Sequence, residues 1–125
     1  MSAVMREDST HFAETLRENS IISPKAYADR MRISVQRLAD LARVHRTTLQ
    51  RAPESEKLQD YMRESVSVIG MLLDANGGNL DRAVYWFRNV PLIELGGETA
   101  ERYVAEGKAN AIRRYIINLA AGATG

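Results

Sequence analysis

The sequence contains no cysteine, and only two histidines, three prolines and eight aromatic residues among its 125 positions. The lack of cysteine excludes disulfides, thiolate metal sites and cysteine nucleophiles. His11 and His45 stand far apart, and no carboxylates join them at metal-ligand spacing, so we expect no metal ion. The glycine patterns of phosphate-binding loops are also missing. We therefore predict that the chain is not an enzyme, has no catalytic residues and needs no cofactor.

Long hydrophobic runs are absent as well. No apolar stretch approaches the roughly 18 residues that a membrane span needs, and the first residues lack the basic-then-apolar pattern of a secretory signal. Apolar residues nevertheless make up 45% of the chain and charged residues 26%, which is the composition of a globular domain with its own core. We expect a soluble cytoplasmic protein with no membrane partner.

Net charge is small overall but concentrated locally. The whole chain carries +1, whereas residues 30–51 hold six arginines and a single acid, Asp40. This segment therefore carries +5 and the remaining residues carry −4. A basic stripe inside a nearly neutral protein is typical of a nucleic-acid contact face, although a solvated helix face has the same composition.

Apolar spacing predicts helices throughout and no strand of useful length, so we expect an all-α fold. Ser23, Ser34, Asn79 and Thr99 are placed to cap helix starts, and the strongest amphipathic pattern lies in residues 55–74. The expected helices cover residues 11–19, two segments starting at Pro24 and Val35, and residues 46–51, 55–74, 80–89, 99–106 and 108–120. Residues 1–10 are unpatterned, and we expect them to form a flexible tail.

Residues 35–50 resemble a helix-turn-helix unit. Ala39 is small enough for the helix crossing, Val44 follows the turn, and Leu49 is the inward residue of the second helix. Arg43 occupies the turn position that usually holds glycine, and Pro53 keeps the second helix short. The alternative is a helical hairpin that only packs against its neighbours. If the unit binds DNA, the expected contact residues are His45, Arg46, Thr47, Thr48, Gln50 and Arg51.

The second half of the chain carries several ordered elements. They are Trp86, Arg88-Asn89, Pro91, Gly96-Gly97, Thr99-Ala100, Glu106-Gly107 and the small tail Gly122-Ala123-Thr124-Gly125. In this order they resemble the toxin-binding domain of the Xre/MbcA/ParS antitoxins, over about residues 57–125. Taken singly, Gly96-Gly97 fits either a tight turn or a close backbone approach, Thr99 is most simply a cap, and Trp86 is more often a core residue.

The resemblance implies a three-part organisation: the tail, a helix-turn-helix region over residues 11–54, and a helical toxin-binding domain over residues 55–125. It implies an antitoxin that blocks the active site of a toxin encoded beside it, usually a RES-domain toxin that consumes NAD or transfers ADP-ribose, and that represses its own operon. The toxin-binding residues would be Trp86, Arg88, Gly96, Gly97, Thr99, Gly122, Ala123, Thr124 and Gly125. Operator binding predicts a homodimer. The alternatives are a free-standing helix-turn-helix regulator without a toxin partner, and a helical scaffold.

Overall fold

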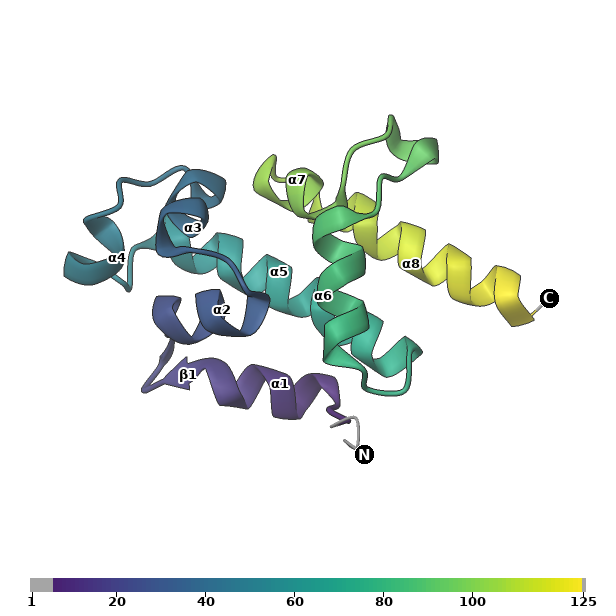
Figure 1. Ribbon diagram of the computed structural model, residues 1–125, viewed down its shortest axis with the longest axis horizontal. Coiled ribbons are helices and arrows are strands. Elements are labelled where there is room, and N and C mark those ends of the chain that lie inside the picture. The colour runs from purple at the N-terminus through teal and green to yellow at the C-terminus, as the bar shows by residue number, and fades with distance from the viewer. Residues whose placement is uncertain (1–5, 125) are drawn as a thin grey trace.

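The computed structural model describes residues 6–124, and these are predominantly helical (Figure 1), which confirms the all-α prediction. The only sheet in this part of the chain is a pair of two-residue antiparallel strands. The elements are α1 (Ser9–Leu16), β1 (Arg17–Glu18), β2 (Ile21–Ile22), α2 (Pro24–Met31), α3 (Val35–Ala42), α4 (Thr48–Arg51), α5 (Glu56–Ala75), α6 (Leu80–Asn89), the 3-10 turn η1 (Ile93–Leu95), α7 (Ala100–Ala105) and α8 (Ala109–Thr124).

The helix starts follow the capping residues of the sequence. Ser23, Ser34 and Ser55 each accept a hydrogen bond from the backbone N–H three residues further on, and so do Asn79 and Thr99. Each of these side chains satisfies one of the N–H groups that a helix leaves unpaired at its first turn. The caps therefore place the boundaries of five helices within a residue or two of the predicted ones.

The long helix α5 is the centre of the molecule. It packs against α1, α3, α6, α7 and α8, and in Figure 1 it runs through the middle of the other helices. Its amphipathic pattern consists of apolar residues repeating every three or four positions, of which Leu58, Met62, Ile69 and Leu73 are buried and Val66 is half-buried. The buried residues form one cluster that extends through both halves of the chain. Residues 11–54 and 55–125 therefore share a single core instead of burying their apolar faces separately.

The N-terminal segment is held more firmly than the sequence indicates. Of the flexible tail expected over residues 1–10, residues 1–5 lie outside the described part of the chain. Residues 6–8 lie against the turn between α5 and α6, and α1 begins at Ser9. The Glu7 N–H donates to the Gly78 carbonyl at 2.9 Å, and the Glu7 side chain is buried against Arg30. Gly78 has φ +86°, and a Cβ there would lie 2.7 Å from the Glu7 backbone, so the docking requires glycine.

The C-terminal helix extends further than predicted. α8 continues to Thr124, four residues beyond the expected end at Ala120, and this extension includes Gly122, although glycine is a poor helix former. The expected small tail is therefore helical up to Thr124. None of the helices within residues 6–124 has both the length and the apolar character needed to cross a membrane.

Candidate nucleic-acid interface and partner surface

The α3–α4 hairpin turns at Arg43, the residue that stands where glycine is usual. Arg43 adopts the left-handed conformation, with φ 58° and ψ 44°, and the Val44 N–H donates to the Ala39 carbonyl at 3.0 Å. This is the helix ending that glycine normally provides, here formed by a residue with a side chain. The turn thus keeps its geometry despite Arg43, at the backbone cost that a left-handed non-glycine residue carries.

The same ending closes α2, eleven residues earlier. Arg32 also has φ 58° and ψ 44°, and the Ile33 N–H donates to the Ala28 carbonyl at 3.0 Å. The sequences Ala-Asp-x-x-Arg-Ile and Ala-Asp-x-x-Arg-Val are therefore two copies of one turn. In each copy an apolar residue after the arginine packs back against the core, which fixes the direction of the next helix.

The second helix of the hairpin is short but has a defined start. α4 spans only Thr48–Arg51, and backbone hydrogen bonds of single helical turns extend its coil back to His45. The His45 ring Nδ1 accepts the Thr47 N–H at 3.3 Å and lies 2.9 Å from the Thr47 hydroxyl. His45 therefore also has a local role, because it occupies the place of a capping side chain at this turn.

The predicted DNA-contact residues lie on the outside of this hairpin. His45, Arg46, Thr47, Gln50 and Arg51 are exposed, and Thr48 is half-buried. Leu49 is buried and Ala39 is fully buried, as expected for the inward residues of the unit. The structure thus brings the predicted contact residues together on one short exposed segment, while the inward residues anchor it to the core.

The six arginines of the basic segment divide into two groups. Half of them pair with acids from outside the segment: Arg30 with Glu7, Arg32 with Asp81 at 2.7 Å, and Arg37 with Glu101 at 2.5 Å. Arg43, Arg46 and Arg51 have no ion-pair partner among residues 6–124. Within residues 30–51, the arginine charge that no acid pairs with therefore lies in the α3–α4 hairpin, at Arg43, Arg46 and Arg51.

A buried carboxylate joins this region to the C-terminal helices. Glu101 of α7 is only 2% exposed, yet Arg37 of α3 pairs with its Oε1, and the Nε of Arg88 in α6 lies 3.8 Å from its Oε2. Arg88 also donates from Nη1 to the Arg32 carbonyl at 3.0 Å. Three helices and the turn after α2 therefore meet at one ionic junction, formed by Glu101, Arg37, Arg88 and the Arg32 carbonyl.

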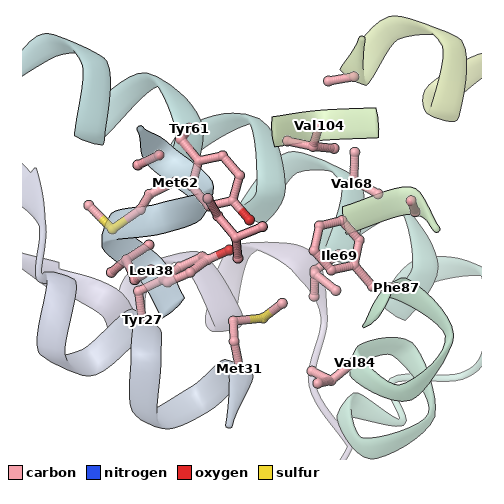
Figure 2. Close-up of a cluster of buried hydrophobic side chains, with 14 of the residues drawn as sticks. Tyr27, Met31, Leu38, Tyr61, Met62, Val68, Ile69, Val84, Phe87 and Val104 are labelled. Carbon is pink, nitrogen blue, oxygen red and sulfur yellow. The ribbon is translucent and has the colours of Figure 1, made fainter. Parts of the chain in front are cut away.

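Two tyrosines lie close to this junction in the core. Tyr27 of α2 and Tyr61 of α5 are buried, their rings meet edge to face at 6.3 Å, and Figure 2 shows their hydroxyls turned toward one another. Neither hydroxyl, nor that of Ser65 one turn along α5, has a well-formed hydrogen bond among the described residues. Burial raises the pKa of Tyr61 to about 12 and raises that of Tyr27 well above its ordinary value.

An apolar surface lies at the other end of the molecule. Ile93 of η1 is 85% exposed, and Ile117 and Leu119 of α8 are 57% and 49% exposed. Between η1 and α8 runs a groove of about 450 Å³, lined in part by Leu95, Tyr115 and Leu119. We call Ile93, Ile117, Leu119 and this groove the η1–α8 surface. Leu119 lines this groove, while Ile93 and Ile117 are exposed elsewhere on the same two elements. Exposed apolar residues together with a groove are typical of a protein-binding surface.

The predicted toxin-binding residues are distributed unevenly around this surface. Gly96 and Gly97 follow η1 with φ near +80°, and a Cβ at either would meet nothing within 4 Å, so a turn and not a close approach requires them. Gly122, Ala123 and Thr124 form the last turn of α8, with Gly122 exposed. Gly125 lies outside the described residues.

The other three predicted residues have internal partners. Thr99 caps α7, and Arg88 belongs to the ionic junction. Trp86 is half-buried, with its ring 6.2 Å from that of Tyr115, while its neighbour Phe87 is fully buried. Trp86 therefore supports the wall of the groove through Tyr115, and only its outer edge is available to a partner.

Sequence reasoning missed Glu101, Ile93, Ile117 and Leu119 as functional candidates. Helical spacing from Ile112 and Ile116 predicts an inward position for Leu119, but α8 projects beyond the core at this end, so Leu119 is left exposed. Ile93 directly follows Leu92 and Ile117 directly follows Ile116. Adjacent positions face different sides of a helix, so the second apolar residue of each pair is a usable signal. The sequence contains no such signal for Glu101, because a glutamate in the first turn of a helix is ordinary.

Comparisons with known proteins identify no relative. No family model, curated protein or solved structure matches the chain. Within residues 6–124 no group of three or more histidines and acids could hold a metal ion. The resemblance of residues 57–125 to antitoxins therefore stays a prediction.

Proposed function

We propose that the chain is an antitoxin of a toxin–antitoxin pair, a cytoplasmic adaptor that binds operator DNA through the α3–α4 hairpin and a toxin through its C-terminal helices. The observation that carries the proposal is the separation of two unlike surfaces. Arg43, Arg46 and Arg51, the three arginines of residues 30–51 without an ion-pair partner among residues 6–124, belong to the α4 end of the molecule, and the η1–α8 surface lies near the opposite end of its long axis (Figure 1). One chain of this shape can hold DNA and a protein partner at the same time.

The DNA end has the features of a groove-binding hairpin. The exposed start of α4 presents Arg46 and Gln50, whose side chains can pair with guanine and adenine edges respectively. Arg43 and Arg51 flank them and are free to contact phosphates, which would orient the hairpin on the duplex. Because α4 is only one turn long, a single hairpin reads few base pairs. We therefore include a homodimer on a two-fold operator in the proposal.

The partner end has the features of a blocking surface. Ile93, Ile117 and Leu119 offer apolar area that water now covers, and the last turn of α8 carries only small residues. Small residues on a projecting helix can enter a cleft that a larger side chain would not fit. Following the resemblance, we assign the occupant as a RES-type toxin and the blocked cleft as its active-site entrance.

The decisive experiment is a growth assay with the adjoining open reading frame, expressed alone and together with this chain. We expect the neighbour to stop growth and the chain to restore it. Ile117→Asp combined with Leu119→Asp should abolish the rescue, because two carboxylates would have to be desolvated in the interface. Arg46→Ala combined with Gln50→Ala is the matched control and should rescue growth fully, since these residues lie at the other end.

Two outcomes would overturn the proposal in different ways. If no flanking product is toxic, the antitoxin reading fails, and a helix-turn-helix regulator without a toxin partner takes its place. If the neighbour is toxic but the doubly acidic variant rescues growth as well as the wild type, the η1–α8 surface is not where the toxin binds.

A further inference from the structure

We infer that Glu101 is a positioning residue, whose buried carboxylate sets the orientation of the DNA-binding hairpin relative to the partner-binding helices α6–α8. The inference deepens the proposed function and rests on it for the roles of the two ends. It comes from the ionic junction, where one carboxylate of α7 is hydrogen-bonded to Arg37 of α3 and also has the Nε of Arg88 in α6 at 3.8 Å, without a hydrogen bond.

The burial of Glu101 makes the junction a strong constraint. A carboxylate that is 2% exposed has given up its hydration, so it depends on its two arginines for compensation. Arg37 reaches it at 2.5 Å from a helix whose other end leads directly into the Arg43 turn and α4. Tilting α3 away from α7 would take the nearer of the two arginines from the buried carboxylate, so the paired orientation is preferred.

Arg88 ties the same carboxylate to the preceding turn. Its Nη1 donates to the Arg32 carbonyl at 3.0 Å. Arg32 is the left-handed residue that ends α2, three residues before α3 begins. The hairpin is therefore held at the turn before α3 through Arg88 and in the first turn of α3 through Arg37. Both ties converge on Glu101, whereas the third link, Arg32–Asp81, is formed by side chains that are 68% and 72% exposed and is correspondingly weak.

This arrangement connects the two binding ends. α7 packs against α8, whose projecting half carries Ile117 and Leu119, and also contacts α3. A partner that shifts α7 when it binds the η1–α8 surface would move the carboxylate to which the hairpin is tied. DNA affinity and partner affinity are then coupled through Glu101, and by linkage the coupling is equal in both directions.

The test uses the absence of cysteine. Spin labels on Gln50→Cys and Asn118→Cys report the distance between α4 and α8 in the full chain, without DNA or toxin, and no native thiol competes for the label. We expect a narrow distance distribution in the otherwise unchanged chain. Glu101→Gln, which keeps the side-chain shape but not the charge, should at least double its width. Asp81→Asn is the matched control and should leave the width unchanged.

A second variant keeps the test decisive if Glu101→Gln does not fold. Arg37→Leu combined with Glu101→Leu removes both charges, so that the pair is replaced by apolar groups. We expect it to fold and to show the same broadening. An unchanged width in a folded Glu101→Gln or double variant would overturn the inference. Unfolding of both would also overturn it, because the junction would then support the core itself and not the orientation. Neither result depends on whether a toxin exists.

Discussion

At the scale of single residues, the basic segment shows how one residue type serves three purposes. Arg37 compensates a buried carboxylate, Arg43 forms a turn in the left-handed conformation, and Arg46 faces solvent with no ion-pair partner among residues 6–124. Charge counting cannot separate these roles, since each arginine adds +1. What separates them is whether the folded chain brings an acid within reach, and in this protein the acids come from distant segments.

The buried tyrosines predict a loss of stability in alkali. Above pH 10 the unfolded chain ionises Tyr27 and Tyr61, whereas burial raises the pKa of Tyr61 to about 12 and that of Tyr27 well above its ordinary value, so the folded chain keeps both protonated there. The folded state then binds more protons, so the free energy of unfolding falls as pH rises above 10, by roughly 1 kcal/mol per pH unit for each tyrosine. Urea unfolding between pH 9 and 11.5 measures this slope.

Tyrosine-to-phenylalanine variants are the control for that slope. Tyr27→Phe and Tyr61→Phe should each reduce it, and at pH 7 they should leave stability unchanged or raised, because each removes a buried hydroxyl without a well-formed hydrogen bond. Equal slopes in all three proteins would show that other groups cause the alkaline unfolding.

Arg43 predicts a gain of stability on replacement. Arg43→Gly relieves a left-handed conformation that costs a residue with a side chain about 1 kcal/mol, partly offset by the greater freedom of glycine in the unfolded chain. We expect Tm to rise by about 2–4 °C in calorimetry. Arg43→Ala removes the same side chain but keeps the strain, so it should bring no such rise. If Arg43→Ala also raises the Tm, the gain comes from removing the arginine charge and not from relieving the backbone.

At the scale of elements, local sequence signals predicted where the helices lie and begin better than where they end. Side-chain caps set the starts of α2, α3, α5, α6 and α7 where the sequence predicts them. The short α4 is different, because its single turn depends on Leu49 in the core and on His45 at its start. An element of this length has no stability of its own, so its place is decided by the surrounding helices.

The hairpin predicts a split between specificity and affinity. Arg46→Ala and Gln50→Ala should each reduce the preference for the operator over a scrambled duplex, by about 1–3 kcal/mol if the side chain makes a bidentate base contact. Competition anisotropy with both duplexes at several salt concentrations measures this preference. Arg32→Ala removes one positive charge from a residue that is paired with Asp81. It should change the operator preference and the salt dependence less than Arg46→Ala does. Equal effects of these two arginine variants would indicate that DNA binding depends on charge alone.

At the scale of the whole molecule, one core holds two functional ends in a defined relation. α5 contacts helices from both halves, and the ionic junction adds a directional tie to this packing. The arrangement differs from two independent domains on a linker, because the connection between α4 and α5 is tied to the first half of the chain. The Gln59 side-chain amide donates to the Pro53 carbonyl at 2.8 Å and to the Ile22 carbonyl at 2.9 Å.

The separation of the ends predicts that the two proposed activities can be removed one at a time. Deleting residues 122–125 takes away the last turn of α8, so growth rescue should be lost while the DNA dissociation constant changes less than twofold. Binding to an operator duplex and colony counts beside the toxic neighbour measure the two effects. Full rescue by the truncated chain would show that the last turn does not block the toxin.

By itself, the sequence determined the helical class, the capped starts of the helices, the inward residues of α5 and the exposed positions of the hairpin. These features depend on spacing and on side chains acting within a few residues of their own position. Only the tertiary structure decided which arginines are paired, that residues 6–8 are docked, that Arg88 and Glu101 meet, and that the end of α8 is uncovered. Each of these depends on contacts between segments distant in sequence, and local patterns contain no information about which distant group will be near.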